Sequence, residues 1–359
     1  MRSGGRWCAP ERVRVTRPFA WRAGARLALV WTLVVWGCGG GSAPPAGPSS
    51  HTTPTGQPGD VHADMAGWVE YTLGNAPLII SAPHGGALAP TSLPERSCAD
   101  CVLVTDDNTE ELARKVASQF YARTGQRVHL VINRLKRAKF DPNRELAEAT
   151  GSNPLLTASW YAYQAFIDTA SIRITASPGR GLLLDLHGHG HVIPRLELGY
   201  LISPASLRLS DASFNATGAI NASSIAKLAT VALNHPTPAA LVRGPTSLGA
   251  LLVQNGFPSV PSPSDPAPAA ADEYFTGGYI TERHGSLGGG SVDAIQIEAN
   301  RPGARDTNEN LDKYAAAIVT AALEYLRVHY GWTPTATQLV RASAARSGRS
   351  PIRALRAAP

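Results

Sequence analysis

The sequence contains little cysteine or methionine, and it has no internal repeat. Four cysteines and two methionines occur in 359 residues. Without a repeat, the chain is not a solenoid or propeller array, which would show a fixed period. Its apolar run at residues 27–36 is too short for a comfortable transmembrane helix, which needs about 20 apolar residues. These absences favour an ordinary globular body.

The central part of the chain carries no excess of positive charge. The formal net charge of +6 is misleading, because residues 1–37 hold seven arginines and one glutamate, and residues 341–359 hold five arginines and no acid. The remaining body is slightly acidic, which excludes the basic footprint of a nucleic-acid-binding protein. We interpret residues 336–359 as a disordered basic tail.

The N-terminal segment has the pattern of an export signal. Arg22 and Arg26 precede the apolar run at 27–36, which ends at Gly37-Cys38. A basic region, a short apolar region and a small residue before cysteine are typical of a secretory signal, and the sequence around Cys38 resembles a bacterial lipobox. We expect residues 1–37 to be a signal peptide of lipoprotein type, Cys38 to be lipidated, and residues 38–60 to be a flexible linker. The protein would then be secreted or lipid-anchored in the cell envelope; an uncleaved anchor is the alternative.

Two of the cysteines lie close together in the body. Cys98 and Cys101 are spaced Cys-Ala-Asp-Cys. In an oxidising compartment this spacing favours a small disulfide loop. A redox protein built on this pair would need a thioredoxin-like start, which the chain lacks.

Apolar runs that end in histidine are the most informative feature. The segment 181–191 reads Gly-Leu-Leu-Leu-Asp-Leu-His-Gly-His-Gly-His, and the segment 77–86 also runs into a histidine, His84, followed by two glycines. Open α/β sheets place their chemistry beyond the carboxyl ends of strands. Imidazole there is a metal ligand or an acid–base group, so His84 and His187 predict a metal site at one sheet edge.

Strand-like and helix-like segments alternate through the body. We expect residues 61–335 to form one α/β domain of three layers, αβα, around a mixed and mostly parallel sheet. The predicted strands end at Ser81 and lie at 127–132, 181–186, 198–203 and 293–300, and the predicted helices lie at 106–120, 153–176, 220–233, 247–254 and 307–330. A proline-rich loop at 258–271 is a candidate rim or lid.

Four fragments together resemble one known family. Ser-Ala-Pro-His-Gly-Gly (81–86), Asp-Pro-Asn-Arg (141–144), Leu-Asp-Leu-His-Gly-His (184–189) and the segment 277–298 ending in Ala-Ile-Gln-Ile-Glu occur in this order. They resemble an uncharacterised exported branch of the N-formylglutamate amidohydrolase family, in the zinc-carboxypeptidase-like superfamily. The resemblance spans about residues 68–330 and implies the phosphorylase/hydrolase-like fold of that superfamily.

The resemblance implies one zinc ion held by His84, His187 and a carboxylate. In the superfamily the carboxylate commonly lies three residues after the first histidine, where this chain has Ala87. We choose Glu95 as the third ligand, with Asp106 and Asp107 as alternatives. Three protein ligands leave a position for a water whose pKa falls to roughly 7.

The resemblance also assigns roles to other residues. Glu298 is expected to be the catalytic base, and Arg137 is expected to stabilise the charge that develops on the carbonyl oxygen. Asn143 and Arg144 match the pair that holds a substrate carboxylate. Further candidates are Arg283, His284 and Arg301 for an acidic substrate, Asp185 for orienting His187, and His189 and His191 for contacts with the metal ligands or with substrate.

The expected activity is zinc-dependent hydrolysis of an amide bond next to a carboxylate. Small acyl-amino-acid, γ-glutamyl or peptide substrates are expected, with membrane contact only through the lipid anchor, no nucleic acid, and the oligomeric state open. N-formylglutamate is disfavoured because its breakdown is cytoplasmic, and Gln164 stands in the long helix where family members often have histidine. The alternative is a surface lipoprotein that binds an acidic ligand or polymer without turnover, which the missing acid at Ala87 supports.

Overall fold

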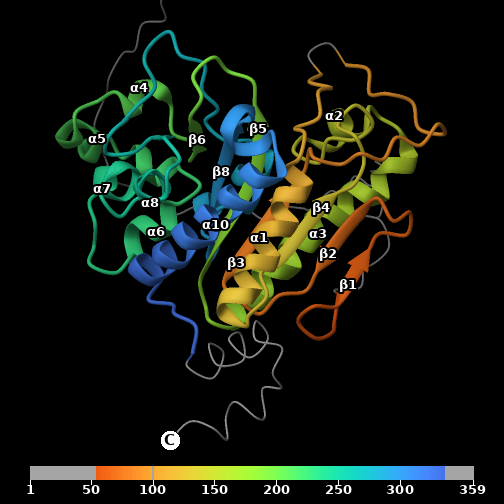
Figure 1. Ribbon diagram of the computed structural model, residues 1–359, viewed down its shortest axis with the longest axis horizontal. Coiled ribbons are helices and arrows are strands. Elements are labelled where there is room, and N and C mark those ends of the chain that lie inside the picture. The colour runs from red at the N-terminus through yellow and green to blue at the C-terminus, as the bar shows by residue number, and fades with distance from the viewer. Residues whose placement is uncertain (1–53, 99–100, 336–359) are drawn as a thin grey trace, which may run out of the picture. The chain divides into compact units, whose positions relative to one another are not determined.

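A mixed sheet of eight strands runs through residues 54–98 and 101–335, which the computed structural model describes (Figure 1). The strand order is β1-β2-β4-β3-β5-β8-β6-β7. The strands are β1 (Val61–Ala63), β2 (Val69–Thr72), β3 (Leu78–Ala82), β4 (His129–Asn133), β5 (Gly181–His189), β6 (Leu196–Gly199), β7 (Ser259–Val260) and β8 (Val292–Asn300).

The centre of the sheet is parallel. Strands β4, β3, β5 and β8 pair in parallel, and β6 pairs in parallel with β7. The pairs β1–β2, β2–β4 and β6–β8 are antiparallel. Because four of these seven pairs are parallel, the mixed and mostly parallel α/β sheet expected from the sequence is confirmed.

Helices connect the strands and cover both faces. They are α1 (Thr109–Thr124), α2 (Leu146–Thr150), α3 (Pro154–Ala176), α4 (Pro204–Leu207), α5 (Asp211–Thr217), α6 (Ala226–Val231), α7 (Pro238–Arg243), α8 (Leu248–Gln254), α9 (Tyr279–His284) and α10 (Asn308–Tyr325). Shorter helical turns are η1 (Ala219–Ala222), η2 (Ser286–Gly288), η3 (Arg301–Arg305) and η4 (Leu326–Tyr330). Within the described ranges, no helix has the length and apolar character to cross a membrane.

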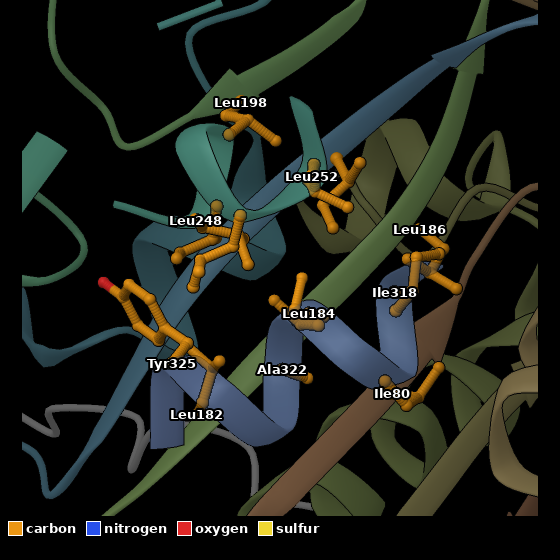
Figure 2. Packing of buried hydrophobic residues seen from close by; sticks show 14 of the residues in the cluster. Ile80, Leu182, Leu184, Leu186, Leu198, Leu248, Leu252, Ile318, Ala322 and Tyr325 are labelled. Atoms are coloured by element: carbon orange, nitrogen blue, oxygen red, sulfur yellow. The ribbon is translucent and has the colours of Figure 1, made fainter. Parts of the chain in front are cut away.

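Alternate residues of the central strands face two separate apolar layers. Leu182, Leu184 and Leu186 of β5 belong to one cluster with α1 and α10, whereas Leu183 belongs to a second cluster with α3. A strand buried on both faces has this period of two. Figure 2 shows α10 lying across the first layer, with Ile318 and Ala322 among the leucines of β5. The three αβα layers follow from this packing.

The structure corrects several predicted elements. The predicted helix at 220–233 is divided into η1 and α6, because Ser224 bonds through its backbone N–H to the carbonyl of Tyr200 and through Oγ to that of Ala294. The predicted strand at 198–203 ends at Gly199. The hairpin β1–β2 and the helices between 204 and 243 other than α6 were not predicted. Residues 1–53 and 336–359, with the signal peptide, Cys38, most of the linker and the tail, lie outside the described residues.

A buried carboxyl group lies at the start of β8, at the opposite end of the strand from the residues that pair with His187 and His189. Asp293 is 1% exposed and accepts hydrogen bonds from Ser286 Oγ at 2.5 Å, Leu228 N at 3.0 Å and Tyr330 Oη at 2.9 Å. Burial raises the pKa of Asp293 to about 6, although these hydrogen bonds oppose the shift. Because the folded pKa lies above the unfolded one, the stability that this group contributes is present below pH 4 and is lost as the pH rises through 6.

Asp293→Asn is expected to remove this pH dependence. From pH 4 to pH 7 the free energy of unfolding of the wild type should fall by about 2 kcal/mol relative to that of the variant, since about two pKa units separate the folded and unfolded carboxyl and the unfolded one is already partly ionised at pH 4. Urea unfolding of both proteins at pH 4, 5.5 and 7 measures the difference. A difference that stays constant over this range would contradict the ionisation argument.

Candidate metal centre

His84 and His187 meet at one edge of the sheet. His84 follows β3 and His187 lies near the end of β5, its parallel neighbour, so both reach the carboxyl edge. Their Nδ1 atoms are 3.0 Å apart. Asp106, from the loop before α1, places Oδ2 at 3.2 Å from Nδ1 of His84 and 3.4 Å from Nδ1 of His187. All three side chains are buried, and we call them the ligand triad.

Two glycines after His84 let the chain carry this histidine inward. A Cβ on Gly85 would lie 2.2 Å from the backbone nitrogen of Glu110, and one on Gly86 would lie 2.2 Å from the carbonyl carbon of Arg134. Any side chain would therefore collide with backbone at both positions. The close approach also brings Asp106 near, because its N–H donates to the carbonyl of His84 at 3.0 Å.

Each histidine of the triad is held by a buried carboxylate through its other ring nitrogen. Nε2 of His84 lies 2.6 Å from Oδ1 of Asp141, and Nε2 of His187 lies 2.8 Å from Oδ2 of Asp185. A carboxylate accepts, so both Nε2 atoms carry the proton and both Nδ1 atoms present lone pairs. Such carboxylate–histidine pairs orient metal-bound imidazoles in proteins. Asp185 thus has the orienting contact that was predicted for it.

The triad fits one divalent cation. Two imidazole lone pairs and one carboxylate oxygen lie 3.0–3.4 Å from one another and would repel without positive charge between them. Ligand atoms about 2.0–2.1 Å from a tetrahedral zinc are separated by roughly 3.3 Å, which matches this spacing.

The structure brings to the histidines a different acid from our first choice of third ligand. Glu95 is exposed and is no member of the group, whereas Asp106, one of the alternatives, is buried in it. Asp107 is exposed and lies 3.5 Å from Arg301 through Oδ2. The reason is a backbone hydrogen bond: the N–H of Asp106 donates to the carbonyl of His84 and brings the segment before α1 to the histidines.

Glu298 stands beside the triad. It pairs in register with His187 across β8 and β5, and its Oε1 lies 3.9 Å from Nδ1 of His187. Gln296 donates from Nε2 to this oxygen at 2.9 Å. Burial raises the pKa of Glu298 to about 8, although His187 opposes the shift. The residue predicted as the base is therefore a buried carboxyl that titrates near neutrality.

Arg137 also reaches the triad. Its Nε donates to Oδ2 of Asp141 at 2.9 Å, and its Nη1 lies 3.4 Å from Oδ1 of Asp106. Its Nη2 makes no hydrogen bond within the described part of the chain. The predicted cation is thus next to the site with one donor nitrogen available.

A second buried arginine, Arg96, contacts both Arg137 and Asp141. Arg96 donates to the carbonyls of Arg137, Glu148 and Val102, and its Nη2 lies 3.4 Å from Oδ2 of Asp141. Burial lowers the pKa of Arg96, although Asp141 opposes this. Cys98 and Cys101 form the predicted disulfide next to it, with Nη1 of Arg96 at 3.7 Å from Sγ of Cys101.

The predicted substrate residues are only partly brought together. Asn143 accepts from the N–H of Ile280 at 2.8 Å through Oδ1, and its Nδ2 lies 3.4 Å from Nε2 of His187. Arg144 is partly exposed and donates from Nε to Glu148 at 2.9 Å and from Nη1 to the carbonyl of Asn143.

The remaining predicted basic residues lie away from the triad. Arg283 lies 3.7 Å from Asp168, and Arg301 pairs with Asp107 on the surface. His284 bonds through Nε2 to Oε1 of Gln164 at 2.7 Å, so this contact joins α9 to α3. These contacts give the three basic residues structural partners.

Three buried residues near the site were not predicted. Asp141 holds His84, and the motif Asp-Pro-Asn-Arg already contained it. Arg305 donates to the carbonyls of Ala299 and Asp107, and a Cβ on Gly188 would meet its guanidinium, which explains this glycine. Glu197 pairs in register with Glu298. No sequence signal marked Arg305 or Glu197, because their proximity arises from the sheet.

Comparison with known proteins gives distant structural similarities. No family model and no protein of curated function matches the chain. Solved structures that resemble it include an N-formylglutamate amidohydrolase from Ralstonia eutropha JMP134, at 13% identity and a TM-score of 0.42, covering 78% of this chain and 98% of the other. A succinylglutamate desuccinylase from Chromobacterium violaceum is 11% identical with a TM-score of 0.33, and the match covers 78% of this chain and 72% of the other. An N-acetylmuramyl-L-alanine amidase from Mycobacterium smegmatis is 15% identical with a TM-score of 0.33, and the match covers 69% of this chain and 96% of the other. At these identities and TM-scores the similarities decide neither substrate nor mechanism.

Substituting the two neighbouring aspartates is expected to separate ligand from bystander. Asp106→Asn should weaken zinc affinity by about 100-fold or more, because it removes a ligand charge from the triad, whereas the matched variant Asp107→Asn should bind like the wild type. Competition with a chromophoric chelator gives the affinities, and elemental analysis gives the stoichiometry. Retention of one zinc by Asp106→Asn together with its loss in Glu95→Gln would restore Glu95 as the ligand.

Proposed function

We propose that this chain is a zinc-dependent hydrolase that cleaves an amide bond next to a carboxylate. The observation that carries the proposal is the convergence of Nδ1 of His84, Nδ1 of His187 and Oδ2 of Asp106, with Glu298 at 3.9 Å from His187. Nitrogen and oxygen ligands in this number suit a catalytic zinc site, which leaves one coordination position open.

The ligand triad would hold the metal, and its carboxylates would keep both imidazoles in the ligating tautomer. When bound, zinc lowers the pKa of a water and polarises a carbonyl oxygen. Asp141 and Asp185 accept the Nε2 protons and fix the ring orientations. Since all these groups are buried, their geometry is set before substrate arrives.

Glu298 is the group that moves protons. Its Oε2 makes no hydrogen bond within the described residues, while Oε1 is held by Gln296. The carboxylate takes the proton of the attacking water and returns it to the leaving nitrogen. A pKa near neutrality suits both steps, because the group must gain and lose the proton in one cycle.

Two further side chains complete the site. Nη2 of Arg137 is available to the carbonyl oxygen as negative charge develops there, and one such donor is worth about 3 kcal/mol. Among the described residues, no hydrogen bond engages Nη2 of Arg144 beside Asn143, so this pair remains the proposed contact for the substrate carboxylate. The substrate class is therefore an N-acyl amino acid, a γ-glutamyl amide or a peptide.

The binding-protein alternative loses its main support. It rested on the absence of an acid at Ala87, and Asp106 supplies a carboxylate to the two histidines from another loop. A site for passive binding of an acidic ligand has no need of a buried carboxyl such as Glu298 beside a metal centre. Export and lipid anchoring of this hydrolase remain proposals based on residues 1–38 alone.

Glu298→Gln is the decisive variant for this function. It should lower kcat by about 100- to 10,000-fold on a cleaved N-acyl glutamate while the protein keeps one zinc, since the amide cannot take up a proton. Release of free amino groups from N-formyl-, N-acetyl- and N-succinyl-glutamate measures turnover, with elemental analysis for the metal. The exposed Glu282→Gln serves as the matched control. Undetectable hydrolysis of acyl-amino-acid, γ-glutamyl and peptide amides by the zinc-loaded wild type would overturn the proposal.

A further inference from the structure

A row of ionisable side chains extends from the triad across the sheet. His187 of β5 pairs in register with Glu298 of β8, and Glu298 pairs in register with Glu197 of β6. Residues in register on neighbouring strands point to the same face. Neighbouring strands lie about 4.8 Å apart, so Glu197 lies roughly 10 Å from His187 along the row.

His191 lies at the far end of this row. Its Nδ1 is 2.8 Å from Oε1 of Glu197, and its ring stacks on Phe275 with a centroid distance of 4.8 Å and an interplanar angle of 17°. The carboxylate accepts from Nδ1–H, which leaves Nε2 as the free ring nitrogen. Nε2 makes no hydrogen bond within the described ranges, and the side chain is 16% exposed.

The loop that carries Phe275 is fastened to the same strand. Glu197 accepts from the N–H of Phe275 through Oε2 at 2.9 Å. Arg195 donates to Asp265 at 2.9 Å and to Asp272 at 2.8 Å. The carboxylate therefore fixes His191 and the aromatic ring beneath it together, so the pair is a preorganised surface and not a chance contact.

A second metal site does not explain this arrangement. His189, His191 and Glu197 are close enough to share an ion. However, His189 bonds through Nε2 to the carbonyl of Arg195 and accepts at Nδ1 from the N–H of His191, and both oxygens of Glu197 are engaged. Only Nε2 of His191 remains available, which suits contact with an organic ligand.

We infer that His191 and Phe275 form a subsite for the acyl part of the substrate, and that this part extends well beyond a formyl group. The inference rests on the proposed hydrolase function. Asn143 contacts His187 and His191 contacts Glu197, so the proposed carboxylate contact and the subsite lie on opposite sides of Glu298. An acyl group of one or two carbons at Glu298 is too short to reach His191, whereas an N-acylated aminoacyl group presents an amide N–H to Nε2 and a flat surface to Phe275.

Binding to a non-cleaving protein tests the subsite. In the zinc-loaded Glu298→Gln variant, calorimetry should show that N-acetylglycyl-glutamate binds about five- to tenfold more tightly than N-acetyl-glutamate, as one added hydrogen bond predicts. Adding His191→Asn should reduce this ratio to about one, and adding the exposed Phe275→Ala should reduce it as well. The matched substitution His235→Asn, at an exposed loop histidine, should keep the ratio.

The outcomes separate this inference from the proposed function. Equal affinities for the two ligands before any subsite mutation, or an equal loss for both ligands on His191→Asn, would overturn the subsite while leaving hydrolysis intact. Turnover by the wild type reports on the proposed function independently, because the affinity ratio is measured in a protein that does not cleave. Circular dichroism checks that each variant is folded. If His191→Asn does not fold, Phe275→Ala still tests the subsite.

Discussion

The site depends on the mutual repulsion of three lone pairs. Two imidazole nitrogens and a carboxylate oxygen are held 3.0–3.4 Å apart in a buried place, and Asp141 and Asp185 prevent the rings from turning their N–H groups inward. Holding like partial charges together is unfavourable unless a cation lies between them. Arg96 and Arg137 balance Asp141, and Arg137 also reaches Oδ1 of Asp106, whereas Oδ2 of Asp106 faces the two Nδ1 atoms.

The sheet supplies the distances on which this arrangement depends. Parallel pairing of β3 with β5 and of β5 with β8 puts His187 and Glu298 on adjacent strands at one edge, where His84 follows the end of β3. Two-sided burial makes those strands rigid, since Leu183 packs against α3 while Leu184 packs against the layer of α10. Loops then need only to deliver Asp106 and Asp141. A precise site is built in this way from a scaffold that cannot slip in register without exposing its leucines.

The sequence allowed prediction of the groups that local patterns mark. The runs ending in His84 and His187, the helix 153–176 and the strand carrying Glu298 were predictable, because apolar period and glycine punctuation are local. The acid that lies beside the two histidines was not predictable, because Glu95 and Asp106 are both loop acids, and a backbone hydrogen bond from Asp106 to His84 brings Asp106 to them. The hairpin β1–β2 lacked a long apolar run, and the broken helix near Ser224 depends on contacts with Tyr200 and Ala294, which are distant in sequence.

The same distinction explains why Glu197 and His191 matter. The sequence marked His191, which ends the histidine-rich segment, but it did not mark Glu197, which antiparallel pairing of β6 with β8 sets beside Glu298. The carboxylate of Glu197 then affects both Glu298 and His191. Its charge contributes to the raised pKa of Glu298, after burial as the main cause, and its oxygens fix His191 and the backbone of Phe275. In the proposed hydrolase, Glu197 would thus couple the base to the substrate contact, and a change in the loop that carries Phe275 would reach Glu298 through this one side chain.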